Sequence, residues 1–247
     1  MKKFLTVALA GVLAASMLFT GCSKKAESKV PDKLIVGTNA EFPPFEYMND
    51  KKQPEGFDIA MIKEIGKRMG KKVEIKNMEF KSLIGAMESD SINAIIAGMT
   101  KTEKREKAVD FSDSYYTTNQ AIILKKDSKI TKLAQLDGKK IGVQEGTTGD
   151  LISSGDKFGD GKKAKVLVKG AKVKRFKKGV DAVMDLKNGS VDAVVIDELT
   201  ANEFVKKNAK KLKIVIDSAG SEYYCIALTK GNTAYKEEVN KQIKAIK

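Results

Sequence analysis

Histidine and tryptophan are absent from this chain of 247 residues, and the only cysteines are Cys22 and Cys225. Without histidine, Ser-His-Asp and Cys-His catalysis, histidine-containing zinc sites and histidine pH switches are excluded. Two cysteines cannot build a disulfide framework or a four-cysteine metal site. Hydrophobic residues make up 42% of the chain and charged residues 32%, which is the balance of a soluble globular protein with a substantial core.

Arginine is scarce as well. It occurs at Arg68, Arg105 and Arg175, so lysine supplies nearly all of the basic excess behind a formal charge of +14. Nucleic-acid-binding modules usually combine arginine clusters with interleaved aromatic residues or a reading motif. Here the lysines are spread along the chain, and the densest runs, 172–178 and 206–213, adjoin helical patterns as solvated faces do. We therefore expect no nucleic-acid partner, and proximity to an anionic membrane is the better functional interpretation.

The first long hydrophobic run indicates export. Lys2 and Lys3 precede an apolar run, 4–19, which is followed by Thr-Gly and then Cys22. This order is typical of a secretory signal peptide, here residues 1–21. The cysteine resembles that of a bacterial lipobox, so we expect lipidation of Cys22, a Ser/Lys-rich tether over 22–32 and an extracytoplasmic location on the outer face of the bacterial cell membrane. A single transmembrane anchor is the alternative, because the run is near the minimum length for a span.

From residue 33 onward, short β-branched runs alternate with helical patterns. Helices are expected at 58–69, 81–88, 178–187, 198–207 and 232–246, where apolar residues recur at helical spacing. Strands are expected at 34–37, 72–76, 94–97, 121–124, 140–143, 193–196, 212–216 and 223–228. The alternation predicts an α/β fold with largely parallel sheets, and the number of strands favours two sheets and hence two lobes. Cys225 lies in the last apolar run and is expected to be buried and inert.

Two short motifs imitate ligand sites. The segment GVQEGTTG (142–149) follows a strand, but it lacks the Lys-Ser/Thr of a Walker loop and the spacing of a dinucleotide fingerprint. The segment 156–167 imitates a calcium loop, but Phe158 occupies its third position and Leu167 the place of the bidentate glutamate. We therefore expect no cofactor and no metal.

Four segments together resemble the extracellular solute-binding proteins, family 3, of polar amino acid ABC transporters. They are VGTNAEFPPFEY (36–47) with GFD (56–58), GMTKTEKR (98–105) running into VDFS (109–112), VQEGTTG (143–149) and DAVVID (192–197). The resemblance covers nearly all of 33–247. It implies a periplasmic-binding-protein-like fold, with two α/β lobes around a ligand cleft. Lobe one would comprise 33–114 plus 222–247, lobe two 120–217, and the hinges 115–119 and 218–221.

The resemblance also implies how the charged ends of a free amino acid are held. A buried charge without a partner costs several kcal/mol, so both ends need one. Arg105 matches the family's arginine for the α-carboxylate, a role that suits its planar guanidinium. Asp197 would accept from the α-ammonium, although an aspartate before a helix is also a common N-cap.

The hydroxyl and amide of Thr100 would also reach the ligand, and the carbonyl of Gly98 would face the ammonium. Thr147 and Thr148 precede an expected helix near Gly149, and backbone amides at a helix start suit the same carboxylate.

The side chain of the ligand is implied to lie between Phe42 and Phe80, with Asn39 and Gln144 at its tip. Several relatives carry an acid at the position of Asn39. The amide here leaves open whether the ligand is glutamine-, arginine- or cystine-like, and Glu41 or Glu145 could supply a charge.

We therefore expect a monomeric, non-enzymatic receptor that binds a polar L-amino acid and delivers it to an ABC transporter permease by hinge closure. Two alternatives stay open. One is an enzyme on the same fold, such as a dehydratase of cyclic acids, with Glu41 as its candidate acid or base. The other is a lysine-rich surface lipoprotein that binds polyanions, which steep salt dependence without amino acid selectivity would reveal.

Overall fold

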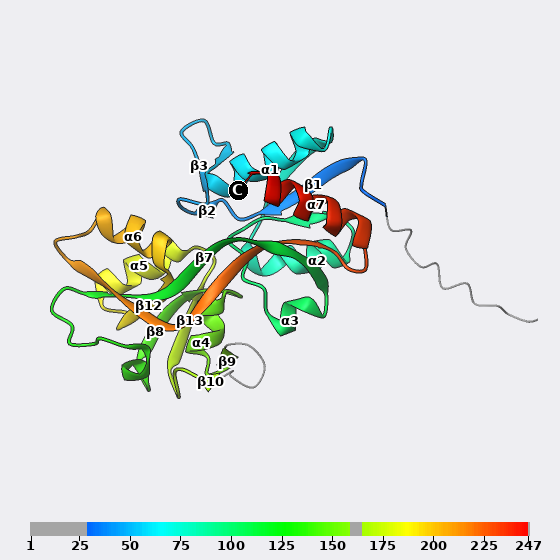
Figure 1. Ribbon diagram of the computed structural model, residues 1–247. Coiled ribbons are helices and arrows are strands. Elements are labelled where there is room, and N and C mark those ends of the chain that lie inside the picture. The colour runs from blue at the N-terminus through cyan, green and yellow to red at the C-terminus, as the bar shows by residue number, and fades with distance from the viewer. Residues whose placement is uncertain (1–28, 159–164, 247) are drawn as a thin grey trace, which may run out of the picture.

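Two long antiparallel strands, β7 (Val109–Lys125) and β13 (Leu212–Thr229), run through the middle of the molecule (Figure 1). They pair from one end to the other, with register shifts between residues 217 and 227. The remaining elements pack toward one end or the other and form two α/β lobes. The computed structural model describes residues 29–158 and 165–246, so the expected signal segment and Cys22 lie outside the described residues.

Lobe one contains a parallel group of strands next to β13. These are β1 (Lys33–Thr38), β5 (Lys72–Asn77) and β6 (Ala94–Ile95). Four helices pack around them, namely α1 (Phe57–Arg68), α2 (Leu83–Glu88), α3 (Glu103–Glu106) and α7 (Thr233–Ile246). A small antiparallel sheet joins β2 (Glu41–Phe42), β3 (Glu46–Met48) and β4 (Pro54–Glu55).

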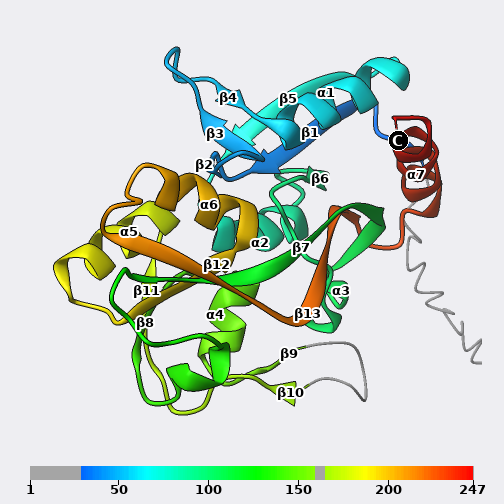
Figure 2. The ribbon, with the colours of Figure 1, turned by 60° about the vertical axis from the view of Figure 1, so that its left-hand side comes forward.

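Lobe two contains a second parallel group next to β7. Its strands are β8 (Lys140–Gln144), β11 (Lys172–Phe176) and β12 (Ala193–Asp197). Its helices are α4 (Thr148–Ser153), α5 (Gly179–Asn188) and α6 (Glu198–Lys206). A short antiparallel pair, β9 (Lys157–Phe158) and β10 (Lys165–Val166), lies beyond α4. In Figure 2, α5 and α6 cover one face of the sheet and α4 the other, so both faces of β12 are buried.

The prediction of two separate sheets is wrong, because one sheet of eight strands crosses both lobes in the order β11-β8-β12-β7-β13-β6-β1-β5. The runs 212–216 and 223–228 are parts of the single strand β13, and 121–124 is the end of β7. Polar residues interrupt the hydrophobic pattern of β7 between Ser112 and Gln120, where the strand passes from one lobe to the other. The segment 115–119 lies in the middle of this strand, and its role as a hinge stays a prediction.

The five predicted helices form, with ends within two residues of the expected ones. The strand β11 was not predicted, because three of the five residues in its sequence KVKRF are basic and interrupt the hydrophobic pattern. It lies at the edge of the eight-stranded sheet, where lysines keep an open strand from pairing with another chain. Within the described residues, no helix is long and apolar enough to cross a membrane.

Cys225 is buried, as expected. Burial raises the pKa of its thiol to about 11, so the thiol stays protonated and unreactive at neutral pH.

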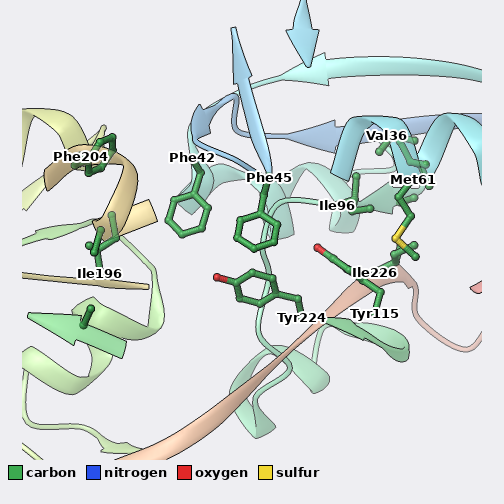
Figure 3. Close-up of a cluster of buried hydrophobic side chains, with 14 of the residues drawn as sticks. Val36, Phe42, Phe45, Met61, Ile96, Tyr115, Ile196, Phe204, Tyr224 and Ile226 are labelled. Atoms are coloured by element: carbon green, nitrogen blue, oxygen red, sulfur yellow. The ribbon is translucent and has the colours of Figure 1, made fainter. Parts of the chain in front are cut away.

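An aromatic cluster connects lobe one to the central strands (Figure 3). The ring of Phe45 lies 5.0 Å from those of Tyr116 and Tyr224, in edge-to-face contact with each. Phe42 stacks at 6.2 Å from Phe45 and belongs to the same buried cluster as Ile196 of lobe two. This packing holds the loop before β3 against β13 and places Phe42 at the boundary between the lobes.

A pair of carboxyl groups is buried beside this cluster. Glu46 of β3 and Asp58 of α1 have no exposed surface. Asp58 accepts hydrogen bonds from the hydroxyl of Tyr115 at 2.7 Å and from the amide of Gly98 at 2.8 Å. Burial, and next the charge of Asp58, raise the pKa of Glu46 well above its usual range. Burial also raises the pKa of Asp58, but its hydrogen bonds from Gly98 and Tyr115 lower it, so Glu46 is the more readily protonated member of the pair.

Glu46→Gln should stabilise the protein, and by more as the pH rises. Because the pKa of Glu46 is higher in the folded than in the unfolded state, its contribution is complete below the unfolded pKa and is lost as the pH rises through the folded pKa. Between the unfolded pKa and the folded pKa of Glu46, each pH unit lowers the unfolding free energy of the wild type by about 1.4 kcal/mol. Glutamine resembles the neutral acid and does not titrate.

Urea unfolding of both proteins between about pH 4 and about pH 8 measures the difference. Glu88→Gln, on an exposed residue at the end of α2, is the matched control and should show no such trend. A stability difference between wild type and Glu46→Gln that stays constant with pH would contradict a protonated Glu46.

Candidate ligand-binding site

A narrow cavity lies between the lobes, and the centre of a water molecule can occupy about 10 Å³ of it. All ten residues that the sequence predicted for the ligand line it. They are Asn39, Phe42, Phe80, Gly98, Thr100, Arg105, Gln144, Thr147, Thr148 and Asp197. Ala97 also lines the cavity and was not predicted. The lobes touch across this space, so the cleft is closed.

Arg105 supplies the positive charge of the cavity. It lies in the single turn of α3, and Thr102 is the N-cap of that helix. The Thr102 hydroxyl accepts from the Arg105 amide at 3.2 Å. Its Nη1 donates to the carbonyl of Thr100 at 2.5 Å and its Nη2 to that of Gly146, in lobe two, at 3.0 Å. Burial lowers the pKa of Arg105 to about 10, so the guanidinium remains charged at neutral pH. Its central carbon lies 5.3 Å from the centroid of the Phe80 ring, on which it stacks.

Asp197 supplies a carboxyl group from the opposite lobe. It ends β12 directly before α6 and is the N-cap residue of that helix, but its side chain makes no capping hydrogen bond. Its Oδ1 instead accepts from the hydroxyl of Tyr224 at 2.8 Å. Burial, and next the charge of Glu222, raise the pKa of Asp197 well above its usual range. A cationic partner in the cavity would favour the ionised form.

Glu222 is a charged residue of this region that sequence reasoning missed. It is 1% exposed and accepts hydrogen bonds from the side chains of Thr100, Thr148 and Gln120. It lies in β13 just after the expected hinge, among residues that match no motif. The burial of this carboxyl group is visible only in the tertiary structure, where β13 pairs with β7 and both lobes pack against β13.

Two amides meet at another wall of the cavity. Gln144 Nε2 donates to Asn39 Oδ1 across the lobes at 2.7 Å and to the carbonyl of Lys177 at 3.2 Å. Asn39 Nδ2 donates to the carbonyl of Met78 at 2.8 Å. The amide pair therefore adds no net charge to this wall.

The two threonines of lobe two have different surroundings. The hydroxyl of Thr147 donates to the carbonyl of Gln144 at 2.8 Å and accepts from the amide of Asp150, so it caps α4. The hydroxyl of Thr148 instead donates to Glu222 at 2.7 Å. The hydroxyl of Thr147 therefore stabilises its own loop and the start of α4, whereas that of Thr148 connects lobe two to β13.

Gly98 allows lobe one to approach this region closely. Its φ is +51°, in the left-handed region that favours glycine. A Cβ here would lie 3.1 Å from the ring of Phe42 and 3.3 Å from that of Tyr224. The glycine therefore lets both rings pack against the backbone that lines the cavity.

Ion pairs between the lobes surround the cavity. Lys81 pairs with Glu145 at 3.0 Å, Lys177 with Glu79 at 2.6 Å, and Lys178 with Glu41 at 2.7 Å. Glu41 and Glu145, the two acids considered as sources of charge for the ligand, are therefore each paired with a lysine and are not among the lining residues. Among the described residues, no three acidic or cysteine side chains are grouped so that they could hold a metal ion.

Comparison with known proteins places the chain in a family. The model of the bacterial extracellular solute-binding proteins, family 3, matches residues 34–247. The chain is 35% identical over 224 residues to the arginine-binding extracellular protein ArtP of Bacillus subtilis (strain 168), covering 90% of this chain and 83% of the relative.

Solved structures agree with this assignment. A mutant of arginine-bound ArgBP from T. maritima superposes with a TM-score of 0.77 at 40% identity, covering 87% of this chain and 96% of that one. An ancestral arginine-binding protein bound to glutamine superposes with a TM-score of 0.76 at 40% identity, covering 88% and 93%. The predicted fold class is confirmed, and so is the expectation of a binding protein rather than an enzyme. The chain belongs to the bacterial extracellular solute-binding proteins, family 3.

Proposed function

We propose that this protein captures a polar or cationic L-amino acid outside the cell, with L-arginine as the first candidate, and presents it to an ABC transporter permease. The observation that carries the proposal is the pair Arg105 and Asp197. These buried, opposite charges come from different lobes and line one closed cavity. A free amino acid carries the complementary pair of charges on adjacent groups.

Arg105 is the partner for the α-carboxylate. The carbonyls of Thr100 and Gly146 orient its guanidinium, so a ligand meets a group whose direction is already set. Asp197 is the partner for the α-ammonium. Binding of that group replaces an unfavourable buried carboxylate by a paired one.

The side chain of the ligand lies between Phe42 and Phe80 and ends near Asn39 and Gln144. Aromatic faces attract a guanidinium and also pack against methylene groups, which suits an arginine side chain. The Asn39–Gln144 amide pair offers oxygen acceptors without net charge, which also suits the amide of glutamine. The names of the similar proteins support both ligands, since one relative is named for arginine and one similar structure holds glutamine.

Closure follows from the position of these groups. The ligand binds the closed form better because only there do Arg105 and Asp197 act together. The Gln144–Asn39 hydrogen bond and the three ion pairs between the lobes add to the stability of the closed form. We take 115–119 and 218–221, the middle segments of β7 and β13, as the hinges about which a monomer opens.

We also propose that Cys22 carries a lipid that holds the protein on the outer face of the cell membrane. The support is the sequence order of basic segment, apolar run, Thr-Gly and cysteine, followed by the tether 22–32. A lipid anchor keeps the receptor near a permease in the same membrane.

L-Arginine should raise the melting temperature of the purified mature protein. A ligand that binds only the folded state adds about 2.7 kcal/mol of stability at a concentration of about a hundred times its Kd. D-Arginine, nucleotides and sugars should have no such effect, because they do not present both charges in the geometry of the site. A thermal-shift screen against the common amino acids makes the measurement. The absence of a shift with every amino acid at millimolar concentration would overturn the proposed function.

Arg105→Ala and Asp197→Ala should each weaken binding by roughly 2–5 kcal/mol, since each leaves a buried charge of the ligand unpaired. This is roughly a thirty- to several-thousand-fold increase in Kd. Arg105→Lys should recover only part of the loss, because an ammonium cannot bind a carboxylate with two parallel hydrogen bonds.

Titration calorimetry with L-arginine measures these affinities, and melting of the ligand-free variants tests folding. Arg68→Ala is the matched control, because Arg68 lies on the surface of α1 and pairs there with Glu64. Wild-type affinity in Arg105→Ala would refute the site assignment.

Cys22→Ser should release the protein from the membrane fraction, since serine cannot take the thioether-linked lipid. Fractionation of cells that produce either form, with immunoblotting, makes the comparison. If the serine variant stays with the membrane at its full length, the first segment is an uncleaved transmembrane anchor and the lipoprotein proposal fails.

A further inference from the structure

Glu222 of β13 lies where the two lobes meet. Its side chain is outside the cavity wall but in contact with residues that form it. One oxygen, Oε2, accepts from the hydroxyl of Thr100 in lobe one at 2.5 Å and from the hydroxyl of Thr148 in lobe two at 2.7 Å. The other oxygen, Oε1, accepts from Gln120 Nε2 at 2.6 Å. Both oxygens therefore act as acceptors, the arrangement of an ionised carboxylate.

The surroundings of the two neighbouring acids agree with this charge state. Burial raises the pKa of Glu222 above its usual value, and the hydrogen bonds from Thr100, Thr148 and Gln120 and the charge of Arg105 offset only part of that rise. Burial and the charge of Glu222 raise the pKa of Asp197 well above its usual range, although hydrogen bonds from Tyr224 and Gln120 lower it. Of the two, Glu222 is the better-supported anion in the ligand-free protein.

This charge determines what the threonines can offer to a ligand. A hydroxyl has one hydrogen to donate and two lone pairs that accept. Thr100 and Thr148 both direct their hydrogen at Glu222, and Thr148 also accepts from Gln120 Nε2 at 3.2 Å. Thr100 then keeps two lone pairs and Thr148 one. Both residues line the cavity, so they present acceptors there and no hydroxyl donor.

Acceptors without a hydrogen attract an ammonium group and repel a carboxylate. We propose that Glu222 is a positioning residue that turns the Thr100 and Thr148 hydroxyls into acceptors, so that Asp197 and both threonines together bind the α-ammonium of the ligand. The inference rests on the proposed function, because it takes the ligand to be an α-amino acid. It makes the site selective for the amino group itself, and the two threonines, one on each lobe, reach that group together only when the cleft is closed.

The test compares wild type with Glu222→Gln. The amide of glutamine has one acceptor oxygen and one NH2 group, so it cannot accept from both threonines and from Gln120 Nε2, and the donor arrangement around position 222 must change. Two ligands are titrated: L-arginine, and 5-guanidinopentanoate, which keeps the carboxylate and the guanidinium but lacks the α-ammonium. The weaker ligand is measured by competition against L-arginine. Glu222→Gln should weaken L-arginine roughly ten- to hundredfold, the range for hydrogen bonds to a charged group, and should change the analogue's affinity by about twofold at most.

The outcomes separate this inference from the proposed function. If wild type does not bind L-arginine, the proposed ligand fails and the inference fails with it. If wild type binds but Glu222→Gln binds equally well, or loses both ligands to the same extent, Glu222 has no role or a purely structural one, and the inference alone is overturned.

A second pair of variants keeps the test decisive where Glu222→Gln does not fold or the analogue is too weak to measure. Thr148→Val keeps the shape of the side chain but removes the hydroxyl, whereas Thr148→Ser keeps the hydroxyl. The serine variant should bind L-arginine within about threefold of wild type, and the valine variant should lose roughly tenfold or more. Equal affinities of the two variants would overturn the inference.

Discussion

The cost of burying a charge without a partner governs the centre of this molecule. In the closed cleft the guanidinium of Arg105 donates to two backbone carbonyls. Burial lowers the pKa of that group, and the charges of Glu222 and Asp197 act on it in the opposite direction. Glu222 is compensated by three donors, and Asp197 accepts from the hydroxyl of Tyr224. In the proposed mode of binding, the carboxylate of an amino acid pairs with Arg105 and its ammonium pairs with Asp197. Under the proposed function, affinity and closure would have the same electrostatic origin.

The pairing of β7 with β13 makes that arrangement possible. Each strand belongs to both lobes, so one continuous sheet supports the two walls of the cavity. The middle of this ladder carries the side chains that meet between the lobes: Tyr115, Gln120, Glu222 and Tyr224. Opening of the cleft would separate Thr100 from Thr148 but leave Glu222 on the strand between them.

Most of the secondary structure of the two lobes could be predicted from local patterns. The helix 58–69 and the strand 193–196 have the periodicity and the length of their type, and both form. The ten cavity residues could be predicted because the chain resembles a known family, and all of them except Phe80 lie in the segments that carry the resemblance. The continuity of β7 and β13 could not, because their middle segments lie between two cores and carry no regular hydrophobic pattern.

By itself the sequence determined the class of fold and most elements of the lobes, because periodicity is a local property, and its resemblance to a family indicated the residues that line the cavity. Only the tertiary structure decided which carboxyl groups are buried and what they face. Glu46 beside Asp58 and Glu222 beneath Thr100 and Thr148 look like ordinary surface acids in the sequence. Burial and hydrogen-bond partners set the charge of a carboxyl group, and here those partners come from distant parts of the chain that meet only in the folded protein.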